Sequence, residues 1–137
     1  MKFEFYHGLP AQARKIREDV FVKEQGFLEE FDSDDTRAVH ILAFDGSQAI
    51  ATCRFFRQEN YYLIGRIAVL KDYRGKGVGK EMLEHAENRI VQLGGKEIRI
   101  HAQQSAEEFY KKLDFISMNV YDYEQDCKHV WMRKSLF

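Results

Sequence analysis

The stretch that decides the fold reads Arg74-Gly75-Lys76-Gly77-Val78-Gly79-Lys80. It follows an apolar segment over residues 61–70 and opens a segment over residues 78–93 in which apolar residues recur at helical spacing. Its glycines let the backbone approach a ligand closely. The unpaired amides at the start of a helix attract anions, above all phosphate groups. We therefore expect a strand, a loop and a helix in succession, with a phosphate-containing ligand at the loop.

Nucleotide-binding motifs do not fit this loop. A P-loop requires GxxxxGK followed by serine or threonine, but Lys80 is followed by Glu81, and Arg74 stands where the first glycine belongs. The dinucleotide fingerprint GxGxxG requires a glycine at the position of Lys80. Taken alone, the loop also fits a glycine-rich turn with solvated lysines.

Hydrophobic spacing predicts an α+β fold with a mixed sheet, in a single domain over residues 1–137. We expect strands over residues 2–6, 39–44, 49–56, 61–70, 97–102, 115–121 and 128–133, and helices over residues 10–23, 78–93 and 106–113. The strands between residues 39 and 70 suit an antiparallel meander, and residues 61–102 suit a parallel crossover. Gly94-Gly95 predicts the end of the long helix. Ser105 and Glu108 have capping-box spacing before the last helix.

The overall composition excludes several classes of protein. The chain carries 21 basic and 22 acidic residues, a net charge of -1, which disfavours a nucleic-acid or membrane partner. No apolar run reaches the length of a membrane span or of a signal peptide. Cys53 and Cys127 show no zinc-binding spacing, so we expect no metal and two reduced thiols in a cytoplasmic protein. A disulfide or a catalytic cysteine is the alternative.

Two motifs resemble those of the GNAT superfamily of N-acetyltransferases. Arg74-x-x-Gly77-x-Gly79 resembles its R/Q-x-x-G-x-G/A pyrophosphate loop, and residues 106–115 resemble its A-x-x-F-Y-x-x-x-G-F segment. Further stretches resemble the compact ElaA-like or YjcF-like bacterial branch. These are residues 20–25, 30–32, His40, 101–103 and His129-x-x-Met132.

The resemblance implies acetyl-CoA as cosubstrate and a sheet that splays between residues 61–70 and 97–102. The pantetheine arm is then expected to enter the gap and pair with the exposed strand backbone, while the loop amides hold the pyrophosphate. The residues expected to bind the cofactor are Ile67, Ala68, Val69, Arg74, Gly75, Lys76, Gly77, Val78, Gly79, Lys80 and Gln103. Asp114 stands where the family usually has glycine. We expect it to adopt a left-handed conformation at a cost of about 1 kcal/mol.

The implied reaction is direct transfer of acetyl to an amine in a ternary complex. Tyr110 is the expected proton donor to the CoA thiolate, although it also fits a wall beneath the cofactor. Glu24, His40 and His129 are the candidate bases, with a water chain as an alternative. Of these, His40 lies inside an apolar strand and fits a core histidine better than a base. The acidic residues between 29 and 35 fit a solvated loop, or a surface that attracts a cationic amine.

Other functions fit the same residues. A non-catalytic acyl-CoA sensor would keep the loop, and a CoA-dependent acyltransferase with a non-amine acceptor would keep the loop and Tyr110. The sequence does not identify the acceptor, which is expected to be a small-molecule or peptide amine. A homodimer is common in the family, but no segment of the sequence identifies an interface.

Overall fold

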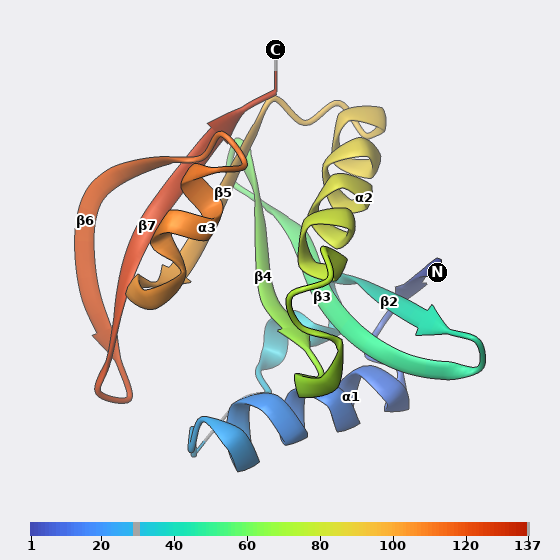
Figure 1. Cartoon of the computed structure of the whole chain (residues 1–137). Coiled ribbons are helices and arrows are strands. Elements are labelled where there is room, and N and C mark those ends of the chain that lie inside the picture. Colours follow the sequence, from blue (N-terminus) through green and yellow to red (C-terminus); the bar gives the residue numbers. More distant parts are fainter. Residues whose placement is uncertain (29–30, 137) are drawn as a thin grey trace.

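The computed structural model describes residues 1–28 and 31–136. Its strands form one sheet in the order β1-β2-β3-β4-β5-β7-β6 (Figure 1). The strands are β1 Lys2–His7, β2 Val39–Asp45, β3 Gln48–Gln58, β4 Tyr61–Val69, β5 Glu97–Gln103, β6 Ile116–Glu124 and β7 Cys127–Ser135. The β2-β3-β4 meander and the parallel pairing of β4 with β5 are confirmed. The mixed sheet therefore follows the prediction.

Helical segments cover both faces of this sheet. They are α1 Ala11–Arg17, η1 Glu18–Glu24, η2 Ser33–Thr36, η3 Lys71–Tyr73, α2 Val78–Gln92, η4 Gln104–Ala106 and α3 Glu107–Lys111. Successive side chains of a strand point to opposite faces. On β2, Ile41 packs in the cluster that holds the apolar face of α2, whereas Leu42 packs with α1. The two longest helical regions therefore lie on opposite sides of the sheet.

The first helical region differs from the expected single α-helix over residues 10–23. The α-helix ends at Arg17, and residues Glu18–Glu24 continue as a π-helix. Its wider turn is closed by the amide of Gln25, which donates to the carbonyl of Val20 at 3.1 Å. Such π segments often occur at functional sites. Here the segment places Phe21 and Gln25 beside the cavity described below.

The sheet splays between β4 and β5. The two strands pair only where Tyr62–Ile64 meets Ile98–Ile100. Beyond this point β4 has an irregularity against β3, and Arg66 adopts a positive φ of 51°. The backbone from Gly65 to Val69 therefore has no strand on its β5 side, and Figure 1 shows β4 and β5 diverging there.

Two turn predictions are confirmed and one is wrong. Gly94 ends α2 with a φ of 89°, and Asp114 adopts the left-handed conformation with a φ of 72°. The capping box of Ser105 and Glu108 does not form. Residues Gln104–Ala106 make a 3-10 turn instead, so Ala106 precedes α3 and no side chain caps it.

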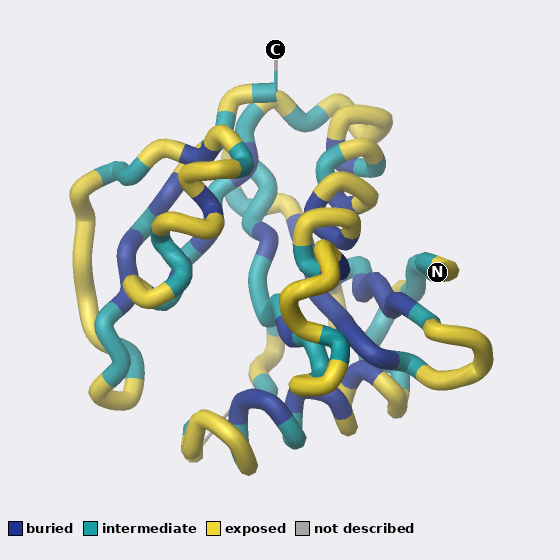
Figure 2. The backbone as a smooth tube through the Cα atoms, viewed as in Figure 1, coloured by how far each residue is buried: buried dark blue, intermediate teal, exposed yellow. Residues whose placement is uncertain are grey.

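Burial is uneven across the molecule. Figure 2 shows buried residues concentrated on the central strands and on the inner side of α2, while β6 is largely exposed. The chain returns from β6 so that β7 lies between β5 and β6. β6 is therefore the outer strand of this end of the sheet. Within the described residues, no helix is long and apolar enough to cross a membrane.

Candidate active site

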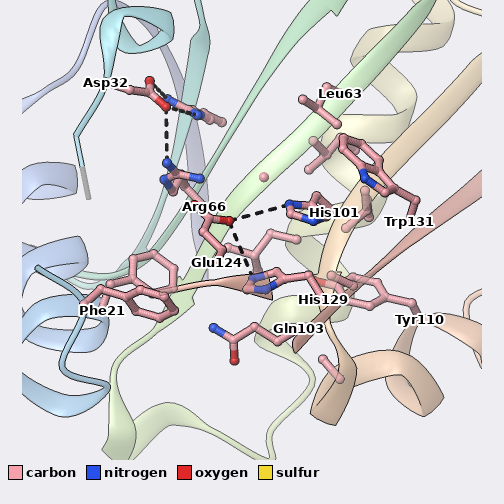
Figure 3. Close-up of a pocket in the computed structure, with 18 of the residues that line it drawn as sticks. Phe21, Asp32, Leu63, Arg66, His101, Gln103, Tyr110, Glu124, His129 and Trp131 are labelled. Atoms are coloured by element: carbon pink, nitrogen blue, oxygen red, sulfur yellow. Dashed lines mark hydrogen bonds and ion pairs between the residues drawn. The ribbon is translucent and has the colours of Figure 1, made fainter. Parts of the chain in front are cut away.

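A cavity of about 430 Å³ lies where β4 and β5 separate (Figure 3). The unpaired part of β4 forms one side of it, through Gly65, Arg66 and Ile67. The opposite side comes from β5, β7 and the end of β6, with Tyr110 of α3 beside them. The π-helix contributes Phe21. The splay thus creates a chamber bounded by two groups of charged residues.

The first group, the arginine cluster, consists of Arg17, Asp32, Asp35, Arg54 and Arg66. Arg17 donates to both carboxylate oxygens of Asp35, at 2.7 and 3.1 Å. Arg54 bridges the two aspartates, with Nη1 at 2.8 Å from Asp35 and at 2.6 Å from Asp32. Arg66 completes the chain at 3.2 Å from Asp32. Every carboxylate of this cluster therefore has a cationic partner.

The pairing of these charges matters because Arg17 and Asp35 are buried. Arg17 is 1% exposed and Asp35 is 5% exposed. Burial by itself raises the pKa of Asp35, but the hydrogen bonds and charge of Arg17, the backbone amide of Asp32 and the charge of Arg54 lower it to about 2. Asp35 also accepts the backbone amide of Asp32 and so closes a capping box on η2. The cluster thus fastens residues 31–36 to the sheet.

The second group, the histidine cluster, consists of His101, Glu124 and His129. Oε2 of Glu124 lies 3.6 Å from Nδ1 of His101 and 3.8 Å from Nε2 of His129. The two imidazole rings have centroids 4.6 Å apart, and His101 stacks on Trp131 at the same separation. Figure 3 shows the carboxylate of Glu124 between the two rings. Three side chains from β5, β6 and β7 therefore converge on one point of the cavity.

The partner of each ring shows which of its two nitrogens carries a hydrogen. Nε2 of His101 lies 2.6 Å from a carboxylate oxygen of Asp122, and Nδ1 of His129 lies 2.8 Å from the carbonyl oxygen of Cys127. The hydrogen bond from His101 lowers the pKa of Asp122, so this partner is an ionised acceptor. Both of these ring nitrogens must therefore donate. In the neutral rings, the nitrogens that face Glu124 then carry lone pairs.

Tyr110 also lines this cavity. It is 7% exposed, and its ring packs edge-on against Phe109 and Phe115. Burial raises the pKa of Tyr110, so the phenol stays protonated at working pH. Within the described residues, its hydroxyl has no hydrogen-bond partner. It is therefore an available proton donor.

Glu24 lies outside this cavity. Its carboxylate makes two hydrogen bonds with Arg74, at 2.5 and 2.7 Å, and they lower the pKa of Glu24. Arg74 also donates to the carbonyl oxygen of Val69 at 2.9 Å. Glu24 is thus held beside the glycine loop rather than beside the histidine cluster.

The glycine loop leads directly into α2. Gly75 and Gly77 have φ values of 76° and 81°, in the left-handed region that favours glycine. Gly77 is the N-cap of α2, and its carbonyl accepts the first helical hydrogen bond from Glu81. The amides of Val78, Gly79 and Lys80 precede any intrahelical acceptor. They are available to an anion at the open end of the splay.

The sequence pattern of the acetyltransferase (GNAT) domain family matches residues 11–136. The chain belongs to the GNAT family. The uncharacterized N-acetyltransferase YjcF of Bacillus subtilis is 35% identical over 99 residues, which cover 71% of each chain. The crystal structure of Escherichia coli ElaA has a TM-score of 0.85 at 25% identity and covers 97% of this chain and 98% of its own. These likenesses assign the chain to the ElaA/YjcF-like branch of the GNAT acetyltransferases.

A more distant neighbour shows how widely this fold is shared. An aminoglycoside 6'-N-acetyltransferase complexed with coenzyme A has a TM-score of 0.76 at 12% identity and covers 98% of its own chain. That likeness concerns the fold alone. The GNAT membership itself identifies the chain as an acetyltransferase that uses an acyl-CoA cosubstrate.

The GNAT cavity brings together some of the residues singled out in the sequence. Ile67, Gln103, Tyr110 and His129 line it. Gln103 donates to the side chain of Gln25 at 2.8 Å and so joins β5 to the end of the π-helix. Ala68 points to the opposite face of β4 and packs with α1.

Two sequence interpretations have clear outcomes. His40 is a core histidine, fully buried with Nε2 2.9 Å from the carbonyl oxygen of Asp35. The acidic segment is not simply a solvated loop, because Asp32 and Asp35 are paired with buried arginines. Glu29 and Glu30 of that segment lie outside the described residues.

Sequence reasoning assigned no role to Glu124, Arg66 or Trp131, and used His101 only as a mark of resemblance. The signal for the histidine cluster was alternation. Residues 122, 124, 129 and 131 flank a hairpin turn, so their side chains fall on one face of a β6–β7 pair. This alternation predicts the histidine cluster only when it is known that β7 pairs with β5.

Proposed function

We propose that this GNAT protein transfers acetyl from acetyl-CoA directly to an amine in a ternary complex. The observation that supports the proposal is the set of groups that line the cavity. The unpaired edge of β4 lies on one side of the cavity, and the histidine cluster lies on the opposite side with Tyr110 beside it. Direct transfer needs these two halves within one chamber.

The donor half is assigned to the unpaired strand and the glycine loop. In this proposal the pantetheine arm pairs with the backbone of Ile67 to Val69, and an amide there stabilises the oxyanion of the tetrahedral intermediate. The loop amides from Gly75 to Lys80 hold the pyrophosphate. Lys76 and Lys80 add positive charge, whereas Arg74 acts mainly by tying the loop to Glu24.

The acceptor half is assigned to the histidine cluster. An amine must lose a proton before it can attack the thioester. We assign this proton to Nε2 of His129, whose lone pair faces the cavity, while Glu124 stabilises the imidazolium that forms. Glu24 is a weaker candidate, because its charge is already committed to Arg74.

Tyr110 is assigned as the proton donor to the departing CoA thiolate. Its hydroxyl is protonated and has no competing partner within the described residues, so it can donate without first breaking a hydrogen bond.

The cysteines support direct transfer rather than an acetyl-cysteine intermediate. Burial raises the pKa of Cys53, and burial together with the charge of Glu124 raises the pKa of Cys127. A nucleophilic cysteine instead needs a lowered pKa. Both thiols are free, which supports the cytoplasm as the compartment.

The test is an acetyl-CoA turnover assay with a panel of small amines, polyamines, amino sugars and peptides, with matched alcohols and thiols as controls. We expect N-acetylated product by mass, intersecting initial-velocity patterns, and no mass gain on the enzyme with acetyl-CoA alone. Tight CoA binding without transfer to any acceptor would instead identify a sensor. Transfer to alcohols or thiols alone would contradict the amine assignment.

A further inference from the structure

The histidine cluster brings together three side chains that can each ligate a metal ion. Nδ1 of His101, Nε2 of His129 and a carboxylate oxygen of Glu124 all lie within 4.8 Å of one another. With both rings neutral, these three atoms are acceptors and nothing among them donates. Such a point attracts a cation. We propose that His101, Glu124 and His129 form a divalent metal site that binds Zn²⁺.

The spacing of the three atoms suits a metal ion. Zinc lies about 2.0–2.2 Å from imidazole nitrogen and carboxylate oxygen, so its tetrahedral ligands are about 3.3–3.6 Å apart. The observed separations from Glu124 are 3.6 and 3.8 Å. All three ligand atoms lie within 4.8 Å of one another, so the side chains must rotate inward to reach bonding distance.

The partners of the two histidines are those of a metal site. A ligating histidine usually donates its other ring N–H to a carboxylate or a backbone carbonyl, which fixes the ring and aims its lone pair at the metal. His101 does so with Asp122 and His129 does so with the carbonyl of Cys127. Both histidines are therefore oriented toward the same point before any ion arrives.

The ligands are rigidly supported. His101 lies on β5 and His129 on the adjacent β7, and β6 pairs His129 with Asp122. His129 is 5% exposed, and His101 is held between the rings of His129 and Trp131. The two arginines that line the cavity, Arg54 and Arg66, are paired with Asp32 and so do not compete for Glu124.

The ligand set favours zinc. Two imidazoles and one carboxylate suit a borderline metal, and hard cations such as Mg²⁺ prefer all-oxygen sites. Three protein ligands leave the fourth position open toward the cavity. Since the proposed base is one of the ligands, bound Zn²⁺ is expected to block the amine and inhibit acetyl transfer. This consequence rests on the proposed function, whereas the binding itself does not.

The test is direct binding to the whole chain after treatment with a chelator. Zn²⁺ is titrated by calorimetry, and Co²⁺ is followed by its visible absorption and by quenching of Trp131, the single tryptophan. We expect one ion per chain, Co²⁺ bands of a four- or five-coordinate nitrogen–oxygen site, and weaker binding at acid pH because protons compete for the ligands. His101→Asn, His129→Asn and Glu124→Gln are each expected to weaken binding by at least about 10-fold.

Two further variants separate this site from other histidines. Asp122→Asn removes only a supporting partner and is expected to weaken binding by about 10-fold. His7→Asn changes an exposed histidine at the end of β1 and is expected to leave binding unchanged. Circular dichroism checks that each variant is folded.

The proposal fails if the folded wild-type chain binds no Zn²⁺ or Co²⁺, or if the ligand variants bind as tightly as the wild type. Metal binding that depends on these ligands, in a chain that acetylates no acceptor, would support the metal site and contradict the proposed function. Acetylation without metal binding would do the reverse.

Discussion

The two charged clusters of the cavity use the same kinds of side chain in opposite ways. In the arginine cluster, both aspartates accept hydrogen bonds from cations, and the buried members are paired. In the histidine cluster, a carboxylate faces one nitrogen of each ring. The other nitrogen of each ring carries a hydrogen and donates it to a different partner. In the arginine cluster, every carboxylate already has a cationic partner. In the histidine cluster with neutral rings, Glu124 gains such a partner only when a proton, an amine or a metal ion enters.

This difference separates structural from chemical roles. A buried ion pair contributes little over an apolar substitute, but removing one partner leaves an uncompensated charge and is costly. Substitutions in the arginine cluster should therefore mainly lower the free energy of unfolding. Substitutions in the histidine cluster, or of Tyr110 with its unpartnered hydroxyl, should mainly lower the rate of acetyl transfer.

The largest effect is expected from breaking the arginine cluster. Asp35→Ala removes the buried carboxylate that both Arg17 and Arg54 contact and should lower the free energy of unfolding by about 3–5 kcal/mol. Urea denaturation measures this. Asp34→Ala is the matched control, because Asp34 lies on the same 3-10 helix but pairs with the exposed Arg37, so about 0–1 kcal/mol is expected. Equal losses for the two variants would contradict a special role for the buried pair.

Removing the hydroxyl of Tyr110 comes next. Tyr110→Phe keeps the packing against Phe109 and Phe115, so stability should hold. If the hydroxyl protonates the CoA thiolate, kcat should fall by about 100-fold. Steady-state kinetics with saturating acetyl-CoA provide the measurement. An unchanged kcat would reduce Tyr110 to a wall of the cofactor site.

Acid should weaken the arginine cluster by protonating Asp35. Because the folded-state pKa of about 2 lies below the ordinary value of 3.8, its contribution is present above about pH 4 and is lost as the pH falls through 2. About 2 kcal/mol is at stake. The stability difference between wild type and Asp35→Ala, measured by urea denaturation, should therefore shrink from pH 5 to pH 2. A constant difference would show that ionisation of Asp35 is not what stabilises the fold.

The smallest effect, and one of opposite sign, is expected at Glu124. Glu124→Gln supplies an amide donor to the ring nitrogens that face it, so the free energy of unfolding should stay constant or rise by less than about 1 kcal/mol. Thermal and urea denaturation measure the change. A loss comparable to that of Asp35→Ala would show that the histidine cluster is also an internal ion pair.

The sequence carries much of the fold but only part of the site. The strands, the long helix and the glycine loop depend on local sequence. Hydrophobic periodicity and the positions of the glycines therefore predict them. Asp114 shows the limit of local reading, since only the family pattern predicted its left-handed conformation. The predicted capping box at Ser105 does not form, because Ser105 lies inside a 3-10 turn that precedes α3.

The residues of the two charged clusters were harder to predict because they meet only through the sheet. Arg17 and Arg54 reach Asp35 from α1 and β3, so the burial of that carboxylate depends on contacts that no local pattern reports. The histidine cluster likewise requires β7 to lie between β5 and β6. Long-range packing decides that strand order, and the strand order decides which side chains meet in the cavity.

The most direct test of this comparison is the rate of amine acetylation by His129→Asn, measured beside its affinity for CoA and its urea midpoint. We expect kcat to fall by about 10²–10⁴-fold, with CoA affinity and stability close to those of the wild type. An unchanged kcat would contradict a role of His129 as the base, as would a loss of activity that only follows a loss of folded protein.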